Sequence, residues 1–335
     1  MAAHLTGRDA PEISIVIPTM GRASLLREML HALSRQSYDP RCVEVIVVQD
    51  GPDADTRSLL DIMRADAAWT LVNVERPRRG RAAARNAGIA RACGRIIVML
   101  DDDIIASPGL LAEHARHHAG SANIVVTGNV PVERLAEEPA HHRAVRQYWE
   151  TQLSRRTAAG HRPAFTDFTT GNASVSRLRL LEAGGFDEAF VEYGREDYEL
   201  GYRLQRAGLR FVYEARALGT HRYHKDPLEW LRQSRTMGRA DVLFARKHPE
   251  LVNEIMALVP FPRVPWLPWA VQLSERATLG LNVGGGKLWG VAATFAQGAH
   301  YWQGVREEVR DPIELRRLVA ARVAARARPT PAATA

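Results

Sequence analysis

The apolar and polar positions of the first hundred residues repeat a unit of one strand followed by one helix. Short apolar runs rich in valine and isoleucine alternate with segments in which apolar residues recur every three or four positions. Because the connections are short, successive strands are expected to lie parallel in one sheet. The sequence therefore predicts an α/β fold with a doubly wound, mainly parallel central sheet and helices on both faces. The expected strands are residues 13–17, 43–48, 69–74 and 95–100, and the expected helices are residues 25–33, 56–63 and 81–92.

The fourth expected strand ends in three consecutive carboxylates, Asp101, Asp102 and Asp103. Ligands of parallel sheets bind at the carboxyl ends of the strands. Adjacent carboxylates repel one another there, which favours a neutralising cation. An all-oxygen cluster suits Mg²⁺ or Mn²⁺, and such ions usually also hold substrate phosphates. The alternative is a solvated acidic turn that precedes the next helix.

Two further strand ends are expected to line the same crevice. Pro18 begins an expected turn after the first strand, and Asp50 follows the second. Asp50 could accept hydrogen bonds from a ribose or base, or it could belong to a plain turn with Gly51. Arginines between residues 76 and 85 could face phosphate. No glycine-rich phosphate motif opens these helices, which argues against a P-loop or a dinucleotide fold.

Seven short motifs together resemble the family 2 glycosyltransferases, which have a GT-A fold. Each motif is weak by itself, but their order along the chain is specific, and the resemblance covers residues 12–245. The motifs lie at residues 18–19, 47–51, 84–94, 100–103, 170–174, 184–187 and 194–200.

This resemblance implies a donor site and a metal site. The aspartate after the second strand, Asp50, would contact the nucleoside, and Arg85 would frame its pocket. A Mn²⁺ or Mg²⁺ ion would be bound by Asp101 and Asp103, with His221 as a third ligand and His224 as the alternative. The predicted nucleotide-sugar site comprises Pro18, Thr19, Arg22, Asp50, Arg81, Arg85, Asp101 and Asp102.

The resemblance also implies that Asp197 is the general base and that Glu196 belongs to the catalytic pair. Sugar transfer needs a carboxylate within hydrogen-bond reach of the acceptor hydroxyl, and a metal can offset the charge of the departing diphosphate. A single displacement would invert the anomeric configuration. The alternative is that both acids merely favour the start of a helix.

The acceptor side is less specific. Gly171 and Asn172 are expected to form a tight turn near the acceptor, and Trp149 lies in a segment, residues 131–163, that is expected to be helical. That segment could be a flap that binds the acceptor or an ordinary surface helix. The paired histidines at 117–118 and 141–142 are expected at the surface.

Net charge and cysteine content limit the partners and the compartment. The net charge of +7 admits nucleic acid, anionic membranes or phosphorylated ligands. No nucleic-acid-binding signature appears, so we expect no nucleic-acid partner. Two cysteines give no disulfide framework, and nothing resembles a secretory signal. The expected location is therefore cytoplasmic, with the inner face of the membrane as an option.

The expected organisation is one catalytic domain followed by a helical extension. Tryptophans and arginines in that extension suit peripheral contact with a membrane, and a helical appendage packed on the catalytic domain is the alternative. The expected parts are a flexible N-terminus at 1–11, a GT-A domain at 12–248 with a nucleotide-sugar-binding half at 12–125 and an acceptor half at 126–248, a helical extension rich in Pro and Trp at 249–328, and a disordered tail at 329–335.

The sequence thus predicts a metal-dependent, inverting glycosyltransferase. Its donor would be a nucleoside-diphosphate sugar, with UDP favoured by family habit. Its acceptor would be a hydroxyl group on a glycolipid, glycan or small molecule, in the cell envelope or in specialised metabolism. The alternatives are a metal-dependent nucleotidyltransferase and a nonenzymatic subunit of the same fold that binds sugar nucleotides.

Overall fold

The structure is a computed structural model that describes residues 11–252, 267–281, 287–311, 313–314 and 317. The predicted tail at 329–335 and nearly all of the predicted flexible N-terminus lie outside these residues. The chain divides into two compact units, described in turn. The first contains residues 1–138, 143–191 and 196–224, and the second contains residues 139–142, 192–195 and 225–335.

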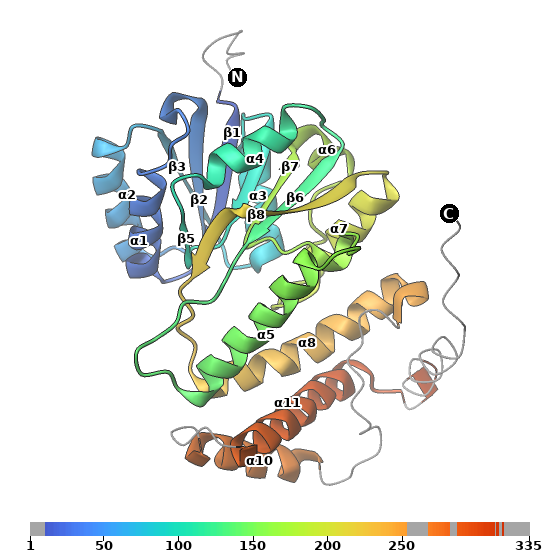
Figure 1. Ribbon diagram of the computed structural model, residues 1–335. Helices are drawn as coiled ribbons and strands as arrows, with labels where there is room; N and C mark the ends of the chain where they lie inside the picture. The colour runs from blue at the N-terminus through green and yellow to red at the C-terminus, as the bar shows by residue number, and fades with distance from the viewer. Residues whose placement is uncertain (1–10, 253–266, 282–286, 312, 315–316, 318–335) are drawn as a thin grey trace. The chain divides into compact units, whose positions relative to one another are not determined.

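The first unit is built on an eight-stranded sheet of order β3-β2-β1-β4-β7-β6-β8-β5 (Figure 1). The first four strands in this order are parallel, as predicted. Strand β7 is antiparallel to both β4 and β6, β8 is parallel to β6, and β5 is antiparallel to β8. The strands are β1 (Ile13–Thr19), β2 (Val43–Asp50), β3 (Thr70–Arg76), β4 (Ile96–Leu100), β5 (Ile104–Ala106), β6 (Ile124–Asn129), β7 (Asn172–Ser176) and β8 (Arg210–His221).

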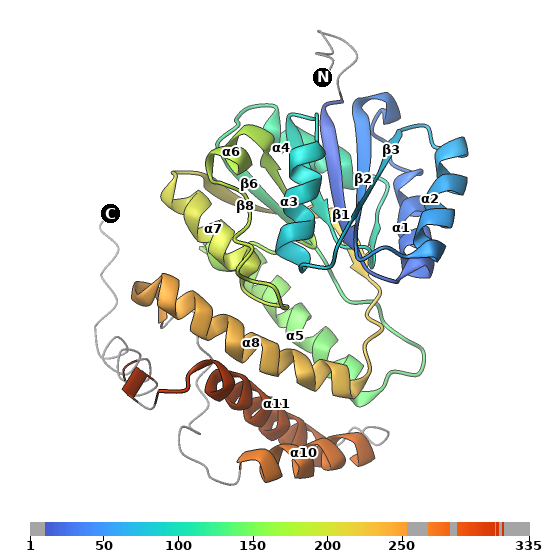
Figure 2. The ribbon, with the colours of Figure 1, turned by 180° about the vertical axis from the view of Figure 1, so that it is seen from behind.

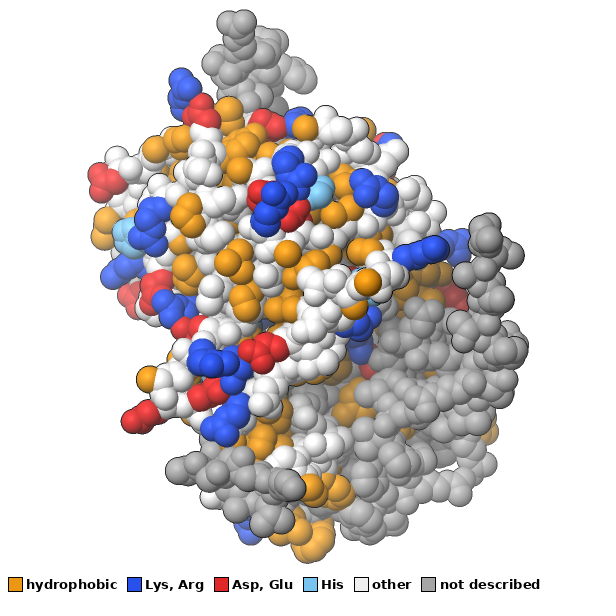
Figure 3. All heavy atoms as spheres, viewed as in Figure 1, with side chains coloured by type: hydrophobic (Ala, Val, Ile, Leu, Met, Phe, Trp, Pro, Cys, Tyr) orange, Lys and Arg blue, Asp and Glu red, His pale blue; other side chains and the backbone are white. Residues whose placement is uncertain are grey.

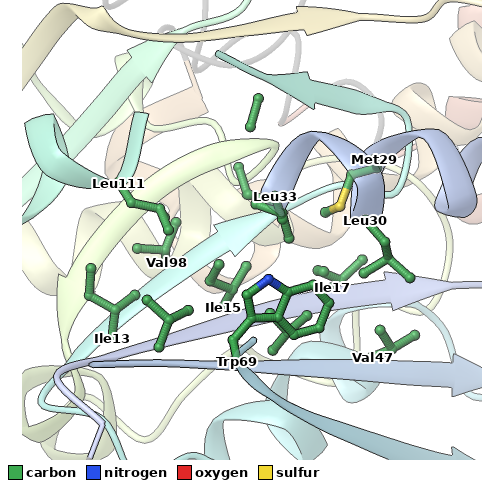
Figure 4. Close-up of a cluster of buried hydrophobic side chains, with 14 of the residues drawn as sticks. Ile13, Ile15, Ile17, Met29, Leu30, Leu33, Val47, Trp69, Val98 and Leu111 are labelled. Carbon is green, nitrogen blue, oxygen red and sulfur yellow. The ribbon is translucent and has the colours of Figure 1, made fainter. Parts of the chain in front are cut away.

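Helices cover both faces of the parallel strands (Figures 1 and 2). Alternate residues of β1, such as Ile15 and Ile17, join a buried cluster with Met29 and Leu111 on one face (Figure 4). That face carries α1 (Ala23–Leu33), α2 (Ala54–Asp66) and α4 (Leu110–His118). The other face carries α3 (Arg81–Arg91), where a Cβ atom on Gly88 would lie 2.4 Å from Val16 Cγ1. The remaining helices of residues 140–206 are α5 (Ala140–Thr157), α6 (Arg177–Glu182) and α7 (Glu196–Arg206).

The turn predicted to begin at Pro18 begins only after Thr19, because β1 continues through that residue. Pairing of β1 with β2 extends to Thr19, whereas pairing with β4 stops at Val16. Proline has no N–H for a sheet. Pro18 is therefore tolerated where β1 has lost one of its neighbours.

The prediction that the paired histidines lie at the surface is wrong for three of the four. His118, on α4, and His141 and His142, on α5, are buried. His117 is partly exposed, and its Nε2 atom lies 2.8 Å from Glu214 Oε2. It belongs to a charged cluster over α4 and β8 (Figure 3). The charge of neighbouring residues suggested an exposed helix, but the sequence did not reveal which side of each helix faces the interior.

The second unit contains α8 (Pro227–Lys247), α10 (Leu267–Leu281) and α11 (Lys287–Glu308). Helices α8 and α11 approach closely at two glycines: a Cβ on Gly238 would lie 2.1 Å from Tyr301 O, and one on Gly304 would lie 1.9 Å from Arg235 O. Helix α8 groups with these helices, although the predicted domain boundary at 248 placed it in the catalytic domain. None of the described helices combines the length and hydropathy needed to span a bilayer.

We expect Gly88→Ala to destabilise the protein by about 1–3 kcal/mol, because the added methyl group collides with Val16 in a packed core. Gly290→Ala is the matched control, since Gly290 also lies within a helix but has no atom near an added Cβ. It should be neutral or should stabilise by up to about 1 kcal/mol. Urea denaturation measures both, and equal effects would contradict the close approach of α3 to the sheet.

Candidate active site

The buried side chain of Asp102 links the residue after β4 to the end of β1. Its side chain is 0% exposed, and Thr19 Oγ1 donates a hydrogen bond to Asp102 Oδ2 at 2.7 Å. Arg22 Nη2 lies 2.6 Å from Asp102 Oδ1. Burial raises the pKa of Asp102 to about 6, although Arg22 opposes the rise. Together with Thr19, Asp102 supports the site from inside the protein, and its predicted contact with the donor stays a prediction.

Asp103 faces His221 across the antiparallel pair formed by β5 and β8. Ile104, the residue after Asp103, pairs with His221 in the sheet. This pairing brings the two side chains together, and Asp103 Oδ2 lies 3.7 Å from His221 Nε2. Burial alone would raise the pKa of Asp103, but His221 and Arg22 outweigh it and hold the pKa well below its usual value. His224 instead contacts Arg22, with 3.4 Å between His224 Nε2 and Arg22 Nη1.

The side chains of Asp103 and His221 have the chemistry that Mn²⁺ or Mg²⁺ would need. A carboxylate oxygen and an imidazole nitrogen are both suitable ligands for Mn²⁺, and water or phosphate oxygens commonly complete such sites. Among the described residues, no three acidic, cysteine or histidine side chains converge as a ready-made metal cage. Arg22 Nη1, 2.9 Å from Asp103 Oδ2, supplies positive charge at this position. The pair thus fits an ion that takes its other ligands from elsewhere.

Arg85 connects the end of β4 to the start of α7. Its side chain is 1% exposed, and it donates from Nη2 to Asp101 Oδ1 at 2.8 Å and from Nη1 to Glu196 Oε1 at 3.1 Å. The guanidinium carbon lies 5.5 Å from the centre of the Phe186 ring. The sequence predicted a role for Arg85 beside the nucleoside, whereas the structure places it between the two groups of acids.

Asp101 keeps its charge because cations surround it. Burial would raise its pKa, but Arg85 and then Arg81 outweigh burial and lower it. Arg81 Nη1 lies 4.0 Å from Asp101 Oδ2, and the Asp101 side chain is 23% exposed. A Cβ on Gly171 would lie 3.5 Å from that same oxygen. Gly171 therefore borders an accessible carboxylate, in the turn that was predicted.

The two predicted catalytic acids have different surroundings. Glu196 is buried against Arg85, and its predicted catalytic role stays a prediction. Asp197 is partly exposed in the first turn of α7, and its Oδ1 atom accepts a hydrogen bond from Tyr198 N at 2.8 Å. Of the two, Asp197 is the more accessible to a substrate.

Asn86 is a positioning residue that the sequence analysis missed. Its side chain donates to Phe186 O at 2.9 Å and accepts from Phe186 N at 2.8 Å. Arg203, on α7, donates to Gly185 O at 2.7 Å in the same loop. Helices α3 and α7 are thus attached to one loop. The only signal in the sequence was that Asn86 follows Arg85 within a motif.

Asp50 orders the loop that precedes α3. Its two carboxylate oxygens accept hydrogen bonds from the backbone N–H groups of Arg79 and Gly80, each at 2.8 Å. Gly80 has φ +92°, which favours glycine. Asp50 therefore holds the arginine-containing loop at the sheet edge, and its predicted contact with the nucleoside stays a prediction.

The side chain of Asn172 is 0% exposed, and its predicted role near the acceptor stays a prediction. Asn172 Nδ2 donates to Ala217 O at 2.8 Å, and Asn172 Oδ1 lies 2.8 Å from His114 Nε2. His114 and His118 both lie 2.8 Å from Ser174 Oγ. Burial lowers the pKa of each histidine to about 4. This neutral network, which the sequence analysis missed, joins α4 to β7 and braces the sheet.

Trp149 lies on α5, which confirms the helix predicted within residues 131–163. It is partly buried, and its ring meets that of exposed Tyr148 edge to face at 5.7 Å. Its role towards an acceptor stays a prediction.

The fold is that of the GT-A class of glycosyltransferases. The family model "Glycosyltransferase like family 2" matches residues 10–239. The chain belongs to this family, and the predicted family and fold are confirmed. Validoxylamine A glucosyltransferase of Streptomyces hygroscopicus subsp. limoneus is 30% identical over 269 residues, which cover 73% of this chain and 58% of that protein. Pre-mycofactocin glycosyltransferase of Mycobacterium tuberculosis (strain CDC 1551 / Oshkosh) is 27% identical over 247 residues, which cover 73% and 50%.

Solved structures agree on the fold. The mannosyltransferase PcManGT from Pyrobaculum calidifontis, in complex with GDP-Man and Mn²⁺, superposes with a TM-score of 0.57 at 20% identity, covering 94% of this chain and 87% of that one. TarS of S. aureus superposes with a TM-score of 0.54 at 12% identity, covering 88% and 55%. The chain spans about three fifths of the length of the first curated relatives it matches.

We expect Arg85→Met to lower the free energy of unfolding by about 3–5 kcal/mol, because it leaves Asp101 and Glu196 without their shared counterion. Arg57→Met is the matched control: Arg57 makes a two-point ion pair with Glu75, but both side chains are substantially exposed. That change should alter stability little. Equal losses in the two variants, measured by urea denaturation, would contradict the central role of Arg85.

Proposed function

We propose that this protein transfers a sugar from a nucleoside-diphosphate donor to an acceptor hydroxyl, with inversion at the anomeric carbon. The observation that carries the proposal is the bridge through Arg85. It joins the strand end that bears Asp101 to the helix that bears Glu196 and Asp197. A site for the leaving diphosphate and a base for the acceptor are thereby held by one buried side chain.

Asp103 and His221 would hold Mn²⁺ or Mg²⁺, with Asp101 beside them. When bound, the ion would act as a Lewis acid and offset the negative charge of the departing diphosphate. Arg22 and Arg81 lie against the same carboxylates and can turn towards phosphate oxygens. The neighbouring structure that was solved with GDP-Man and Mn²⁺ supports a sugar nucleotide and a divalent ion.

Asp197 would accept the proton of the acceptor hydroxyl as the anomeric carbon is attacked. The carboxylate stands in the first turn of α7 and is partly exposed. The buried ion pair of Glu196 with Arg85 fixes the start of that helix, which is how Glu196 would contribute. Direct attack by the acceptor inverts the configuration, because the bond to the acceptor oxygen forms on the face of the anomeric carbon opposite the breaking bond to the diphosphate.

We propose UDP as the nucleotide and a glycolipid, a glycan or a small molecule as the acceptor. The relatives include a validoxylamine A glucosyltransferase, a pre-mycofactocin glycosyltransferase and a chondroitin synthase, whose acceptors differ in size. A cytoplasmic location, peripheral membrane contact through the C-terminal region, and the division of the catalytic domain at residue 125 belong to the same proposal.

We expect Asp197→Asn to lower kcat for sugar transfer by about 10²–10⁴-fold, because the amide cannot accept the proton. Asp103→Asn should abolish transfer and also weaken donor binding. Asp61→Asn, on the exposed side of α2, is the control and should behave as the unmodified protein. Release of the nucleoside diphosphate from the donor measures turnover. Proton NMR of the glycosylated product, recorded as soon as it forms, reports its anomeric configuration.

Two outcomes would favour the alternatives. An Asp197→Asn variant that stays active while Asp103→Asn is inactive would indicate a nucleotidyltransferase. Donor binding without any turnover in the unmodified protein would indicate a nonenzymatic subunit.

A further inference from the structure

The chain enters α7 through two successive residues in the left-handed region. Gly194 has φ +121° and Arg195 has φ +67°, and Arg195 is the only described residue other than glycine with a positive φ. The next residue, Glu196, begins α7. A left-handed conformation at a residue that bears a Cβ atom is strained, and it persists only where the surroundings impose it.

A buried carboxylate of the second unit holds the Arg195 side chain. Arg195 Nε donates to Asp241 Oδ1 at 2.5 Å, and the Asp241 side chain is 0% exposed. The hydroxyl of Tyr301 donates to the other oxygen, Asp241 Oδ2, at 2.7 Å. Asp241 lies on α8 and Tyr301 on α11, so two helices of the C-terminal part of the chain hold one arginine.

The neighbouring residues strengthen this attachment. A Cβ on Gly194 would lie 3.1 Å from Met237 Sδ, so the glycine packs directly on α8. Glu192 Oε1 accepts a hydrogen bond from Arg239 Nη1 at 2.8 Å. Residues 192–195 are thus bound to α8 by an exposed ion pair, a packed glycine and a buried ion pair, and they group with the second unit for this reason.

We infer that Arg195, Asp241 and Tyr301 position the general base. Asp197 follows Arg195 by two residues, so the backbone conformation at Arg195 sets the direction in which α7 begins. The C-terminal helices thereby act on the reaction through the chain itself, and Arg195 is a positioning residue that touches no substrate. This inference rests on the proposed role of Asp197.

A purely structural role would have a different signature. A buried ion pair is weak evidence for stability, since the free energy lost when both charges leave water offsets much of their mutual attraction. A small displacement of a reacting group, in contrast, lowers kcat strongly and need not alter donor binding. The two roles therefore differ in whether kcat changes while donor binding stays the same.

The test uses the full chain and compares Asp241→Asn, Tyr301→Phe and Arg246→Gln. Asp241→Asn removes the charge that holds Arg195. Tyr301→Phe removes only the hydrogen bond from the tyrosine hydroxyl to Asp241. The control, Arg246→Gln, breaks ion pairs between α8 and the end of α11, away from residues 192–195. The measurements are kcat, the donor KM, the Kd of the nucleoside diphosphate, and hydrogen exchange of amides 200–203 in α7.

We expect kcat to fall about tenfold in Asp241→Asn and about threefold in Tyr301→Phe. The donor KM and the Kd should stay within about twofold, and amides 200–203 should exchange faster. Arg246→Gln should lower the melting temperature without these changes. An unchanged kcat in folded variants, or an equal fall in Arg246→Gln, would overturn the inference. Should Asp241→Asn not fold, Tyr301→Phe decides.

Failure of the inference and failure of the proposed function are distinguishable. Absence of transfer by the unmodified protein would contradict the proposed function and, with it, the positioning of a base. If the unmodified protein transfers sugar but amides 200–203 exchange at the same rate in Asp241→Asn and Tyr301→Phe, only the inferred role of Arg195, Asp241 and Tyr301 would be contradicted.

Discussion

The arrangement of the site depends on one buried guanidinium, that of Arg85. Removing a charged arginine from water is costly, and two carboxylates from distant parts of the chain offset that cost. One is Asp101, at the end of β4, and the other is Glu196, at the start of α7. If either acid moved away, one side of the buried guanidinium would lose its partner, so both pairs favour a fixed separation between the sheet edge and the helix. The close approach of α3 to the sheet at Gly88 keeps Arg85 in place between them.

Positive charges match the acids around this bridge. Arg22 contacts both Asp102 and Asp103, and His221 faces Asp103 from β8. The cations lower the pKa of Asp101 and Asp103 at the sheet edge, whereas burial raises the pKa of Asp102 to about 6.

The sequence predicted the parallel strands well, because continuous apolar runs mark strands that are covered on both faces. It did not predict that β7 lies antiparallel between β4 and β6, since a strand's residues do not specify its neighbours. Asp101, Asp103 and His221 were predicted from the family resemblance, and the structure places Asp103 beside His221, while their binding of a metal stays a prediction. Asn86 and His114 were missed, because their importance comes from partners far along the chain.

The account is tested most directly by calorimetric titration of UDP, GDP, CDP and dTDP into the purified protein, with and without Mn²⁺, and again into Asp103→Asn. It predicts that one diphosphate binds, that binding requires the metal, and that the substitution weakens it strongly. Absence of metal-dependent binding for all four nucleotides would contradict the account and would leave the acids at the end of β4 as a structural turn.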